Sequence, residues 1–293
     1  MKVIAAHETL SDPFRDVYPD LEIWKTQRSA DLVIFTGGED IDPSIYREKP
    51  EGAYGINLER DTRELSLLKK ILDGSFTVGK VLGVCRGHQL ISAFLGMSLI
   101  QDIYSLGINH RANHQISWEG ENLFSYIRNV NSMHHQVVSN KSHSLYKEGY
   151  MPIFLAREPG QGLCESILWG NNIFCVQFHP EFFQSGEKSK FFDRLNKWIS
   201  GDPFFSRGEK ETKSRYKRLD YEEILRGGPA FWQDLNPIRT DENTATSSIS
   251  TATSGNTTDD RIFTFNPGIL ETLPNDIEPE PEEFPEESDE EVE

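Results

Sequence analysis

The sequence predicts an α/β protein with a mostly parallel central sheet and helices on both faces. Four short apolar runs, typical of buried parallel strands, alternate with segments of helical periodicity along the first 200 residues. Two of these runs end directly at residues with reactive side chains. Since ligands bind outside the carboxyl ends of the strands in such sheets, we expect a functional site there. The strand-like runs are residues 3–6, 32–35, 81–84 and 174–177.

The second run ends in Thr36-Gly37-Gly38, where residues without bulky side chains allow backbone amides to face a ligand. Together with the amide of Arg86, the amide of Gly38 is predicted to form an oxyanion hole for a tetrahedral intermediate. A plain glycine turn is the alternative interpretation of this segment.

Residues 61–73 form an amphipathic pattern, with Leu65, Leu68, Ile71 and Leu72 on one face, which predicts a helix packed on the sheet. Arg60 and Asp61 stand at its start. Asp61 is interpreted either as the helix cap or as part of a functional site. A last helix is predicted over residues 189–200, because its aromatic and aliphatic residues recur mostly on one side.

The third run leads into Gly83-Val84-Cys85-Arg86-Gly87, which a helical pattern follows over residues 88–95. A Gly-x-nucleophile-x-Gly sequence at a strand-to-helix turn projects one reactive side chain above a sheet. The glycines leave room for strand and helix to approach, and the positive end of the helix favours a thiolate. The pentapeptide alone is equally consistent with a buried core cysteine.

The fourth run favours the nucleophile, because it ends in His179-Pro180-Glu181. A histidine at a strand end can act as general base to a thiol, and a carboxylate two residues later can fix its tautomer and orientation. We therefore predict Cys85, His179 and Glu181 as the catalytic residues.

The remaining histidines and cysteines are not predicted to be catalytic. The histidines at 110, 114, 134 and 135 are clustered in the sequence, but neither a zinc-binding His-x-x-x-His helix nor a Cys-x-x-Cys pair accompanies them, so we predict no metal. His110 and His143 are expected to be solvated loop residues. Cys164 and Cys175 are expected to be core residues of a hairpin around residues 170–172, and three cysteines do not make a disulfide scaffold.

Charge divides the chain unevenly. Residues 1–200 hold 21 basic and 24 acidic residues, whereas residues 201–293 hold 9 and 23, so the net charge of −17 arises mostly from the tail. This balance argues against a nucleic-acid surface, which needs a basic face. We predict a charged linker with a possible short helix over residues 201–239 and a disordered, Ser/Thr-rich and acidic tail over residues 240–293. The tail is interpreted as a solubilising extension or as a docking arm for a protein partner.

Taken together, the motifs resemble the class I glutamine amidotransferase superfamily, whose Gly-x-Cys-x-Gly-x-Gln elbow and Gln-x-His-Pro-Glu segment are matched by residues 83–89 and 177–181. The chain is most similar to the γ-glutamyl hydrolase branch, which includes γ-glutamyl-GABA hydrolases. This resemblance covers about residues 1–200. It is carried by Thr36-Gly37-Gly38-Glu39-Asp40-Ile41-Asp42-Pro43 with Tyr46, Arg60-Asp61 with Glu64, Arg86 after the cysteine, Gln101-Asp102, and Asn131-Ser132-Met133-His134-His135-Gln136.

The resemblance implies a flavodoxin-like catalytic domain over residues 1–200 that cleaves a γ-glutamyl amide bond through a thioester on Cys85, without a cofactor. It further implies that His134 borders the substrate, and we add Gln89 and Gly37 as substrate-binding residues; the Arg86 side chain is a further candidate for recognising the glutamyl group. Two alternatives remain: a glutaminase subunit that supplies ammonia to a separate synthetase, recruited by the tail, and a non-catalytic binding or assembly protein.

The first residues read as a strand rather than as the core of a signal peptide, and no apolar run approaches the roughly 18 residues that a membrane span needs. We therefore expect a cytoplasmic protein whose partners are a small γ-glutamyl compound or glutamine, and neither a membrane nor a nucleic acid.

Overall fold

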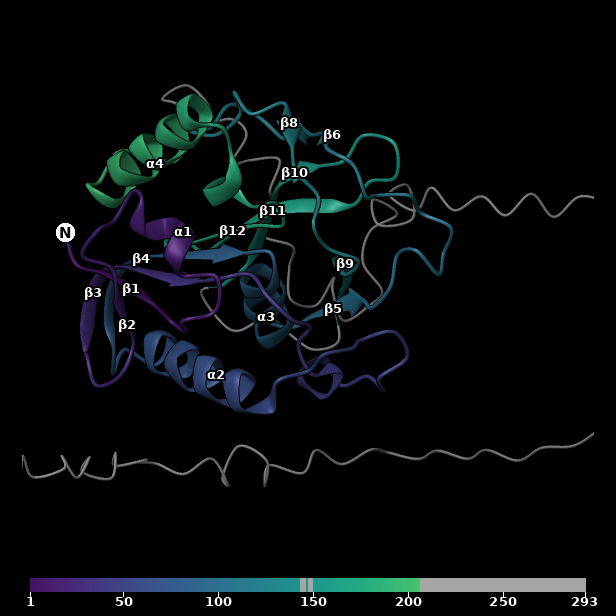
Figure 1. Ribbon diagram of the computed structural model, residues 1–293, viewed down its shortest axis with the longest axis horizontal. Helices are drawn as coiled ribbons and strands as arrows, with labels where there is room; N and C mark the ends of the chain where they lie inside the picture. Colours follow the sequence, from purple (N-terminus) through teal and green to yellow (C-terminus); the bar gives the residue numbers. More distant parts are fainter. Residues whose placement is uncertain (143–145, 147–149, 206–293) are drawn as a thin grey trace, which may run out of the picture. The chain divides into compact units, whose positions relative to one another are not determined.

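A computed structural model of the chain describes residues 1–142, 146 and 150–205 (Figure 1). The predicted acidic tail, and the predicted linker from residue 206 onward, lie outside the described residues. The helices and strands occur in the order β1 (Val3–Ala5), α1 (Asp12–Arg15), β2 (Glu22–Ile23), β3 (Ser29–Phe35), η1 (Pro43–Tyr46), α2 (Leu58–Leu72), β4 (Thr77–Val84), α3 (Arg86–Phe94), β5 (Met97–Ile100), β6 (His114–Gln115), β7 (Ser117–Trp118), β8 (Asn129–Val130), β9 (Val137–Ser142), β10 (Pro152–Arg157), β11 (Cys164–Trp169), β12 (Ile173–Val176), η2 (Pro180–Phe182) and α4 (Ser185–Ile199).

The central sheet has eight strands in the order β2-β1-β3-β4-β12-β11-β10-β7. The five strands from β2 to β12 run parallel, and β11, β10 and β7 continue the sheet in antiparallel fashion. All four predicted strands lie next to one another in the parallel part, as β1, β3, β4 and β12. The prediction of a mostly parallel sheet is therefore confirmed, and the antiparallel extension is an addition to it.

Helices cover both faces of this sheet, as predicted. Figure 1 shows α1 and α4 on one side of the strands and α2 and α3 on the other. Two separate apolar cores match these two layers. The α4 core contains Phe191, Phe192 and Trp198, whereas the opposite core contains Leu68 of α2 and Ile91 of α3. Burial of one apolar stripe per helix holds each layer on the sheet.

Two details of α2 differ from the prediction. The helix begins at Leu58 rather than at residue 61, because the side chain of Asn57 caps it by accepting a hydrogen bond from the backbone amide of Arg60. Asp61 is therefore not the cap and lies inside the first turn, so the capping interpretation is wrong. Leu67 is fully buried, whereas Leu65 is only half-buried.

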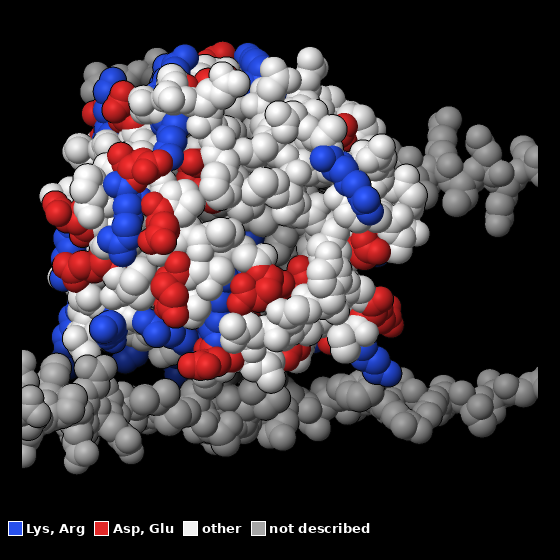
Figure 2. Space-filling view, viewed as in Figure 1, with Lys and Arg blue, Asp and Glu red and all other residues white. Residues whose placement is uncertain are grey.

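The hairpin predicted around residues 170–172 is formed by β11 and β12, and it buries both Cys164 and Cys175 as expected. Beyond α4, Phe204 packs against the aromatic side chains of the α4 core. Within the described part of the chain, no helix combines the length and the apolar character needed to cross a bilayer. Figure 2 shows Lys and Arg interspersed with Asp and Glu over the part of this face where α1, α2 and α4 lie.

The order of strands in the sheet determines where the predicted catalytic residues lie. Although β4 and β12 are far apart in the sequence, they are neighbours, with Val84 paired to Val176 at their carboxyl ends. The next residue of β4 is Cys85, whose backbone amide donates to the carbonyl of Val176 at 2.8 Å. His179 follows β12 by three residues. The predicted nucleophile and base therefore leave the sheet at the same edge, side by side.

Candidate active site

The turn between β4 and α3 holds Cys85 in a backbone conformation that side chains rarely adopt. Its φ is 50° and its ψ is −105°, which costs about 1–3 kcal/mol for a residue other than glycine. Helix α3 begins at the next residue, so the amide of Arg86 has no partner within the helix. Gly87 is required at this turn, because a Cβ there would lie 2.1 Å from the carbonyl oxygen of Phe35. Strand, turn and helix thus form the predicted elbow.

His179 and Glu181 are both buried beside this elbow. The ring N–H at Nδ1 of His179 donates to Glu181 Oε1 at 2.7 Å, and the side chain of Cys85 lies near enough to His179 to raise the pKa of its imidazole. Because Nδ1 is hydrogen-bonded to Glu181, Nε2 is the ring nitrogen that can exchange a proton with the thiol. The structure therefore brings the three predicted catalytic residues into one chain of contacts.

The electrostatics of this chain favour a charged imidazole. Burial alone lowers the pKa of His179, but the charge and hydrogen bonds of Cys85 and Glu181 outweigh it and raise the pKa to about 10. An imidazolium at neutral pH stabilises a thiolate beside it, which is the reactive form of a cysteine.

Asn131 holds the backbone of His179 in place. Its Nδ2 donates to the carbonyl of His179 and its Oδ1 accepts from the amide of His179, both at 2.8 Å. Such a two-point contact fixes both position and direction of the peptide that carries the base. Sequence reasoning placed Asn131 in a motif but assigned it no role, since an amide that clamps a backbone leaves no periodic signal.

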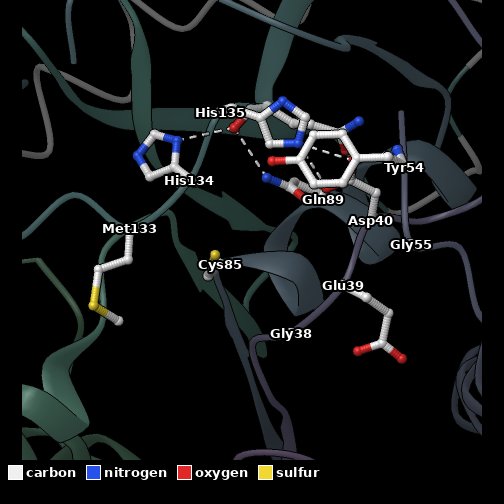
Figure 3. Close-up of a pocket in the computed structure, with 11 residues that line it drawn as sticks. Gly38, Glu39, Asp40, Tyr54, Gly55, Cys85, Gln89, Met133, His134 and His135 are labelled. Atoms are coloured by element: carbon white, nitrogen blue, oxygen red, sulfur yellow. Dashed lines mark hydrogen bonds and ion pairs between the residues drawn. The ribbon is translucent and has the colours of Figure 1, made fainter. Parts of the chain in front are cut away.

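A pocket of about 200 Å³ opens over Cys85 (Figure 3). Its lining includes Gln89 and His134, the predicted substrate-binding residues, and Gly38 of the predicted oxyanion hole, together with residues that sequence reasoning did not assign to substrate. Among the described residues that line the pocket, two are carboxylates and none is Lys or Arg. The lining consists of Gly38, Glu39, Asp40, Tyr54, Gly55, Cys85, Gln89, Met133, His134, His135 and Gln136.

Two glutamines form part of the pocket in different ways. Gln89 is already engaged, since its Nε2 donates to the carbonyl of Gln136 at 3.0 Å. The side chain of Gln136 is buried, and neither its Nε2 nor its Oε1 has a hydrogen-bond partner among the described residues. A buried primary amide without a partner costs free energy unless a ligand satisfies it. Gln136 and His134 are thus lining residues with buried polar atoms that have no partner among the described residues.

One wall of the pocket is built by His135. Its Nε2 lies 2.9 Å from Asp40 Oδ2, and the ring of Tyr54 stacks on its other side at 4.4 Å (Figure 3). The backbone amide of Tyr54 also donates to Asp40. The backbone amides of residues 51–53, which directly precede Tyr54, donate to Gln101 Oε1. These hydrogen bonds fix the loop that carries Tyr54. Two motifs that are distant in the sequence thus close one side of the site.

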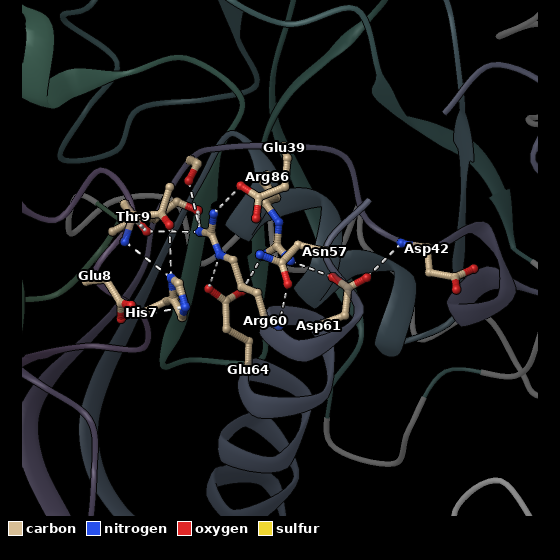
Figure 4. A network of polar contacts seen from close by, with 12 residues as sticks. His7, Glu8, Thr9, Glu39, Asp42, Asn57, Arg60, Asp61, Glu64 and Arg86 are labelled. Carbon is tan, nitrogen blue, oxygen red and sulfur yellow. Dashed lines mark hydrogen bonds and ion pairs between the residues drawn. The ribbon is translucent and has the colours of Figure 1, made fainter. Parts of the chain in front are cut away.

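The side chain of Arg60 makes five hydrogen bonds and has no exposure to solvent (Figure 4). It pairs with Glu39 at 2.8 Å and with Glu64 at 2.9 Å, and it donates to the carbonyls of Thr36 and Gly37. A Cβ on Gly38 would lie 2.2 Å from Arg60 Nη1. The glycines after β3 therefore allow a guanidinium to hold the loop that carries the predicted oxyanion-hole amide.

Arg86 turns its side chain away from the pocket. Its guanidinium pairs with Asp61 and Glu64, so Glu64 joins both arginines (Figure 4). Asp61 also accepts from the amide of Asp42. The Arg86 guanidinium does not line the pocket, so the idea that it recognises the glutamyl group does not fit its position; its backbone amide remains the predicted oxyanion donor. Gly37 likewise does not line the pocket and lies against His179 instead.

Two further histidines, His110 and His114, lie beside His134. The ring of His110 lies 5.0 Å from that of His134 and 4.0 Å from that of His114. His110 is 4% exposed, so its prediction as a solvated loop residue is wrong, and His143 lies outside the described residues. Glu165 on β11 contacts His110 and His114. Burial acts to raise the pKa of Glu165, but its interactions with these two histidines lower the pKa to about 2.

Comparisons with known proteins identify the family of the chain. Residues 19–181, which include Cys85, His179 and Glu181, match the family model described as Peptidase C26. The glutamine amidotransferase-like protein YvdE of Lactococcus lactis is 32% identical over 166 residues, which cover 52% of this chain and 66% of that protein. Protein NtpR of Enterococcus hirae is 30% identical over 177 residues, covering 54% and 70%. A glutamine amidotransferase structure from Thermotoga maritima has a TM-score of 0.44 at 16% identity, covering 80% of this chain and 93% of its own.

Proposed function

Because the chain belongs to the Peptidase C26 family of glutamine amidotransferase-like proteins, we propose that it is a cysteine hydrolase that cleaves the amide bond of a small γ-glutamyl compound. The observation that carries this proposal is the contact chain from Cys85 through His179 to Glu181 at the floor of a pocket. A hydrolase of this type needs a nucleophile, a base that is oriented by a third group, and oxyanion donors.

In the first step, the Cys85 thiolate attacks the δ-carbonyl carbon of the γ-glutamyl group. A carbon–sulfur bond forms and the π electrons move to the carbonyl oxygen. The amides of Gly38 and Arg86 donate to this oxyanion. Loss of one such donor typically raises the barrier by about 3 kcal/mol.

In the second step, the oxyanion collapses and the carbon–nitrogen bond breaks. His179 transfers its proton to the departing amine, which leaves a γ-glutamyl thioester on Cys85. Water then attacks the thioester carbonyl while His179 accepts a proton from it. The carbon–sulfur bond breaks, glutamate leaves, and the thiolate–imidazolium pair is restored. Glu181 keeps Nδ1 protonated throughout, so Nε2 is the atom that exchanges the proton.

Recognition of the glutamyl group rests on polar atoms of the pocket. The carboxylates of Glu39 and Asp40 suit an α-ammonium group, and the unpartnered amide of Gln136 suits an α-carboxylate. Gln89 and His134 complete the enclosure next to Cys85. The volume of about 200 Å³ is below the range usual for drug-sized ligands, which supports a substrate of amino-acid size.

The test is mass-spectrometric detection of glutamate released from a panel of γ-glutamyl-amines, γ-glutamyl peptides and glutamine. Wild type is compared with Cys85→Ala, and Cys164→Ala serves as the matched control because that thiol is buried away from the pocket. We expect release from at least one γ-glutamyl-amine or γ-glutamyl peptide by wild type and the control, and none by Cys85→Ala. Silence of folded wild type across the panel contradicts the proposal, and release from glutamine alone points to an ammonia-supplying subunit instead.

A further inference from the structure

We propose that His110, His114 and Glu165 form a binding site for one divalent transition-metal ion of the zinc type, next to the catalytic pocket but separate from it. The proposal does not depend on the identity of the substrate. It rests on the donor atoms, on their spacing, and on buried polar atoms that have no partner.

The donor set is the first argument. The Nε2 atoms of His110 and His114 lie 3.2 and 3.1 Å from the same oxygen of Glu165. All three donor atoms lie within 4.8 Å of one another. Tetrahedral coordination with metal–ligand bonds of about 2.0–2.1 Å places donor atoms roughly 3.3 Å apart. The two histidine–glutamate distances therefore match the edges of such a site, and the imidazoles, whose donor atoms lie within 4.8 Å of each other, have to approach for the third edge to match.

The second argument is the state of the glutamate. Glu165 is fully buried on β11, and its Oε2 has no hydrogen-bond partner among the described residues. An unpaired oxygen of a buried carboxylate is costly, and native structures generally satisfy such atoms with protein, water or an ion. A cation bound through Glu165 neutralises the carboxylate at the same place. The Nε2 of His134, whose ring neighbours His110, is also buried without a partner in the described structure.

The chemistry of the donors selects the class of ion. Two imidazoles and one carboxylate suit zinc and its neighbours among the transition metals, whereas Mg²⁺ and Ca²⁺ prefer sites made of oxygen. Three protein ligands leave one coordination position, for water or for the imidazole of His134.

The position of the site indicates what the ion does. His110 and His114 belong to the segment that leads from β5 to β8, and Glu165 belongs to the central sheet. An ion between them fastens this segment to the sheet. The same segment continues into Asn131, which clamps His179, and into His134 at the pocket. We infer a structural ion that supports the pocket wall rather than one that contacts the substrate.

The experiment uses the full chain without a histidine tag, stripped of metal by chelator and dialysed. Zn²⁺ and Co²⁺ are titrated by calorimetry, and the visible spectrum of the Co²⁺ form reports the coordination number. We expect one ion per chain, a higher Tm, an intense Co²⁺ spectrum typical of four-coordinate sites, and no comparable effect of Mg²⁺. Glu165→Gln and His114→Gln are expected to weaken binding at least tenfold, whereas His7→Gln, outside the cluster, leaves it unchanged.

Absence of stoichiometric binding to folded wild-type protein would overturn the proposal. So would binding that Glu165→Gln and His114→Gln leave undiminished, because the ion would then lie elsewhere. The Co²⁺ spectrum of wild type decides the matter even where a variant fails to fold, since a six-coordinate, weakly absorbing ion is incompatible with this site. None of these measurements requires enzymatic activity, so their failure is distinguishable from failure of the hydrolase proposal.

Discussion

Gly37 lies against the imidazole of His179 so closely that a Cβ on Gly37 would stand 2.6 Å from Cε1 of the ring. Real Cβ atoms do not approach another atom so closely, so the ring has to move if a side chain is introduced. Gly37 therefore lies where a side chain would displace the proposed base, and we expect it to position His179.

Replacing Gly37 with alanine tests this relationship. We expect Gly37→Ala to displace His179 from Cys85 and to lower kcat about 100-fold, the effect of a misplacement near 1 Å. Steady-state kinetics on the substrate found by the glutamate assay measure this. Gly186→Ala is the control, because a Cβ at that position in α4 meets nothing within 4 Å. Equal kcat values for the two variants would contradict the positioning role.

The proton on His179 predicts a specific pH dependence. Protonation of the leaving amine requires the imidazolium, so kcat/KM should fall on the alkaline side as pH rises through the raised pKa of about 10. Removing the charge of Glu181 removes one cause of that raised pKa. Glu181→Gln should therefore shift the alkaline limb to lower pH, in addition to reducing the rate.

The measurement is the pH profile of kcat/KM for wild type, Glu181→Gln and Glu187→Gln. Glu187 is exposed on α4, so its replacement should leave the limb where wild type has it. If the limb of Glu181→Gln coincides with that of wild type, Glu181 does not control the charge on His179.

The clamp formed by Asn131 should matter for both stability and rate. Asn131→Ala removes two hydrogen bonds to the peptide groups of His179, at about 1 kcal/mol each. We expect the free energy of unfolding to fall by about 2 kcal/mol and kcat to fall as well. Urea denaturation and kinetics measure the two effects. Asn131→Asp keeps the acceptor but loses the donor, and an unchanged stability in both variants would show that the clamp contributes nothing.

Glu64 should be the most sensitive position of the buried charge network. It is the carboxylate that Arg60 and Arg86 share, with no exposure to solvent. Glu64→Gln keeps the shape but leaves two buried guanidiniums short of a counter-charge, which typically costs about 3–5 kcal/mol. Chemical denaturation should show this loss. Glu59→Gln, exposed on the same helix, should change stability by less than about 0.5 kcal/mol, and similar losses in both variants would argue against the network.

The features that could be predicted from the sequence are those determined by residues close together in the chain. The glycines around Cys85 and the short distance from His179 to Glu181 specify an elbow and an oriented imidazole by local geometry alone. The four parallel strands were recognisable because each is a continuous apolar run bounded by glycine or polar residues. The start of α2 was missed by three residues because Asn57 caps the helix from a stretch with no apolar periodicity.

The features that were missed depend on contacts between distant segments. His110 looked solvated because the residues around it are polar, yet its burial is decided by Glu165, which β11 brings beside it. The direction of the Arg86 side chain follows from the placement of α3 against α2, because Arg86 pairs there with Asp61 and Glu64 of α2. The unpartnered side-chain amide of Gln136 could likewise not be predicted, because its burial depends on segments that are distant in the sequence.

The place of β12 in the sheet determines when the candidate site can form during synthesis of the chain. β12 is the last strand among the residues that the structure describes, yet it inserts between β4 and β11 and carries His179 to its place. The elbow of Cys85 is made from β4 and α3, which leave the ribosome much earlier. A nascent chain thus contains Cys85 before it contains His179. The contact on which the proposed mechanism depends can form only when β12 has been made and docked.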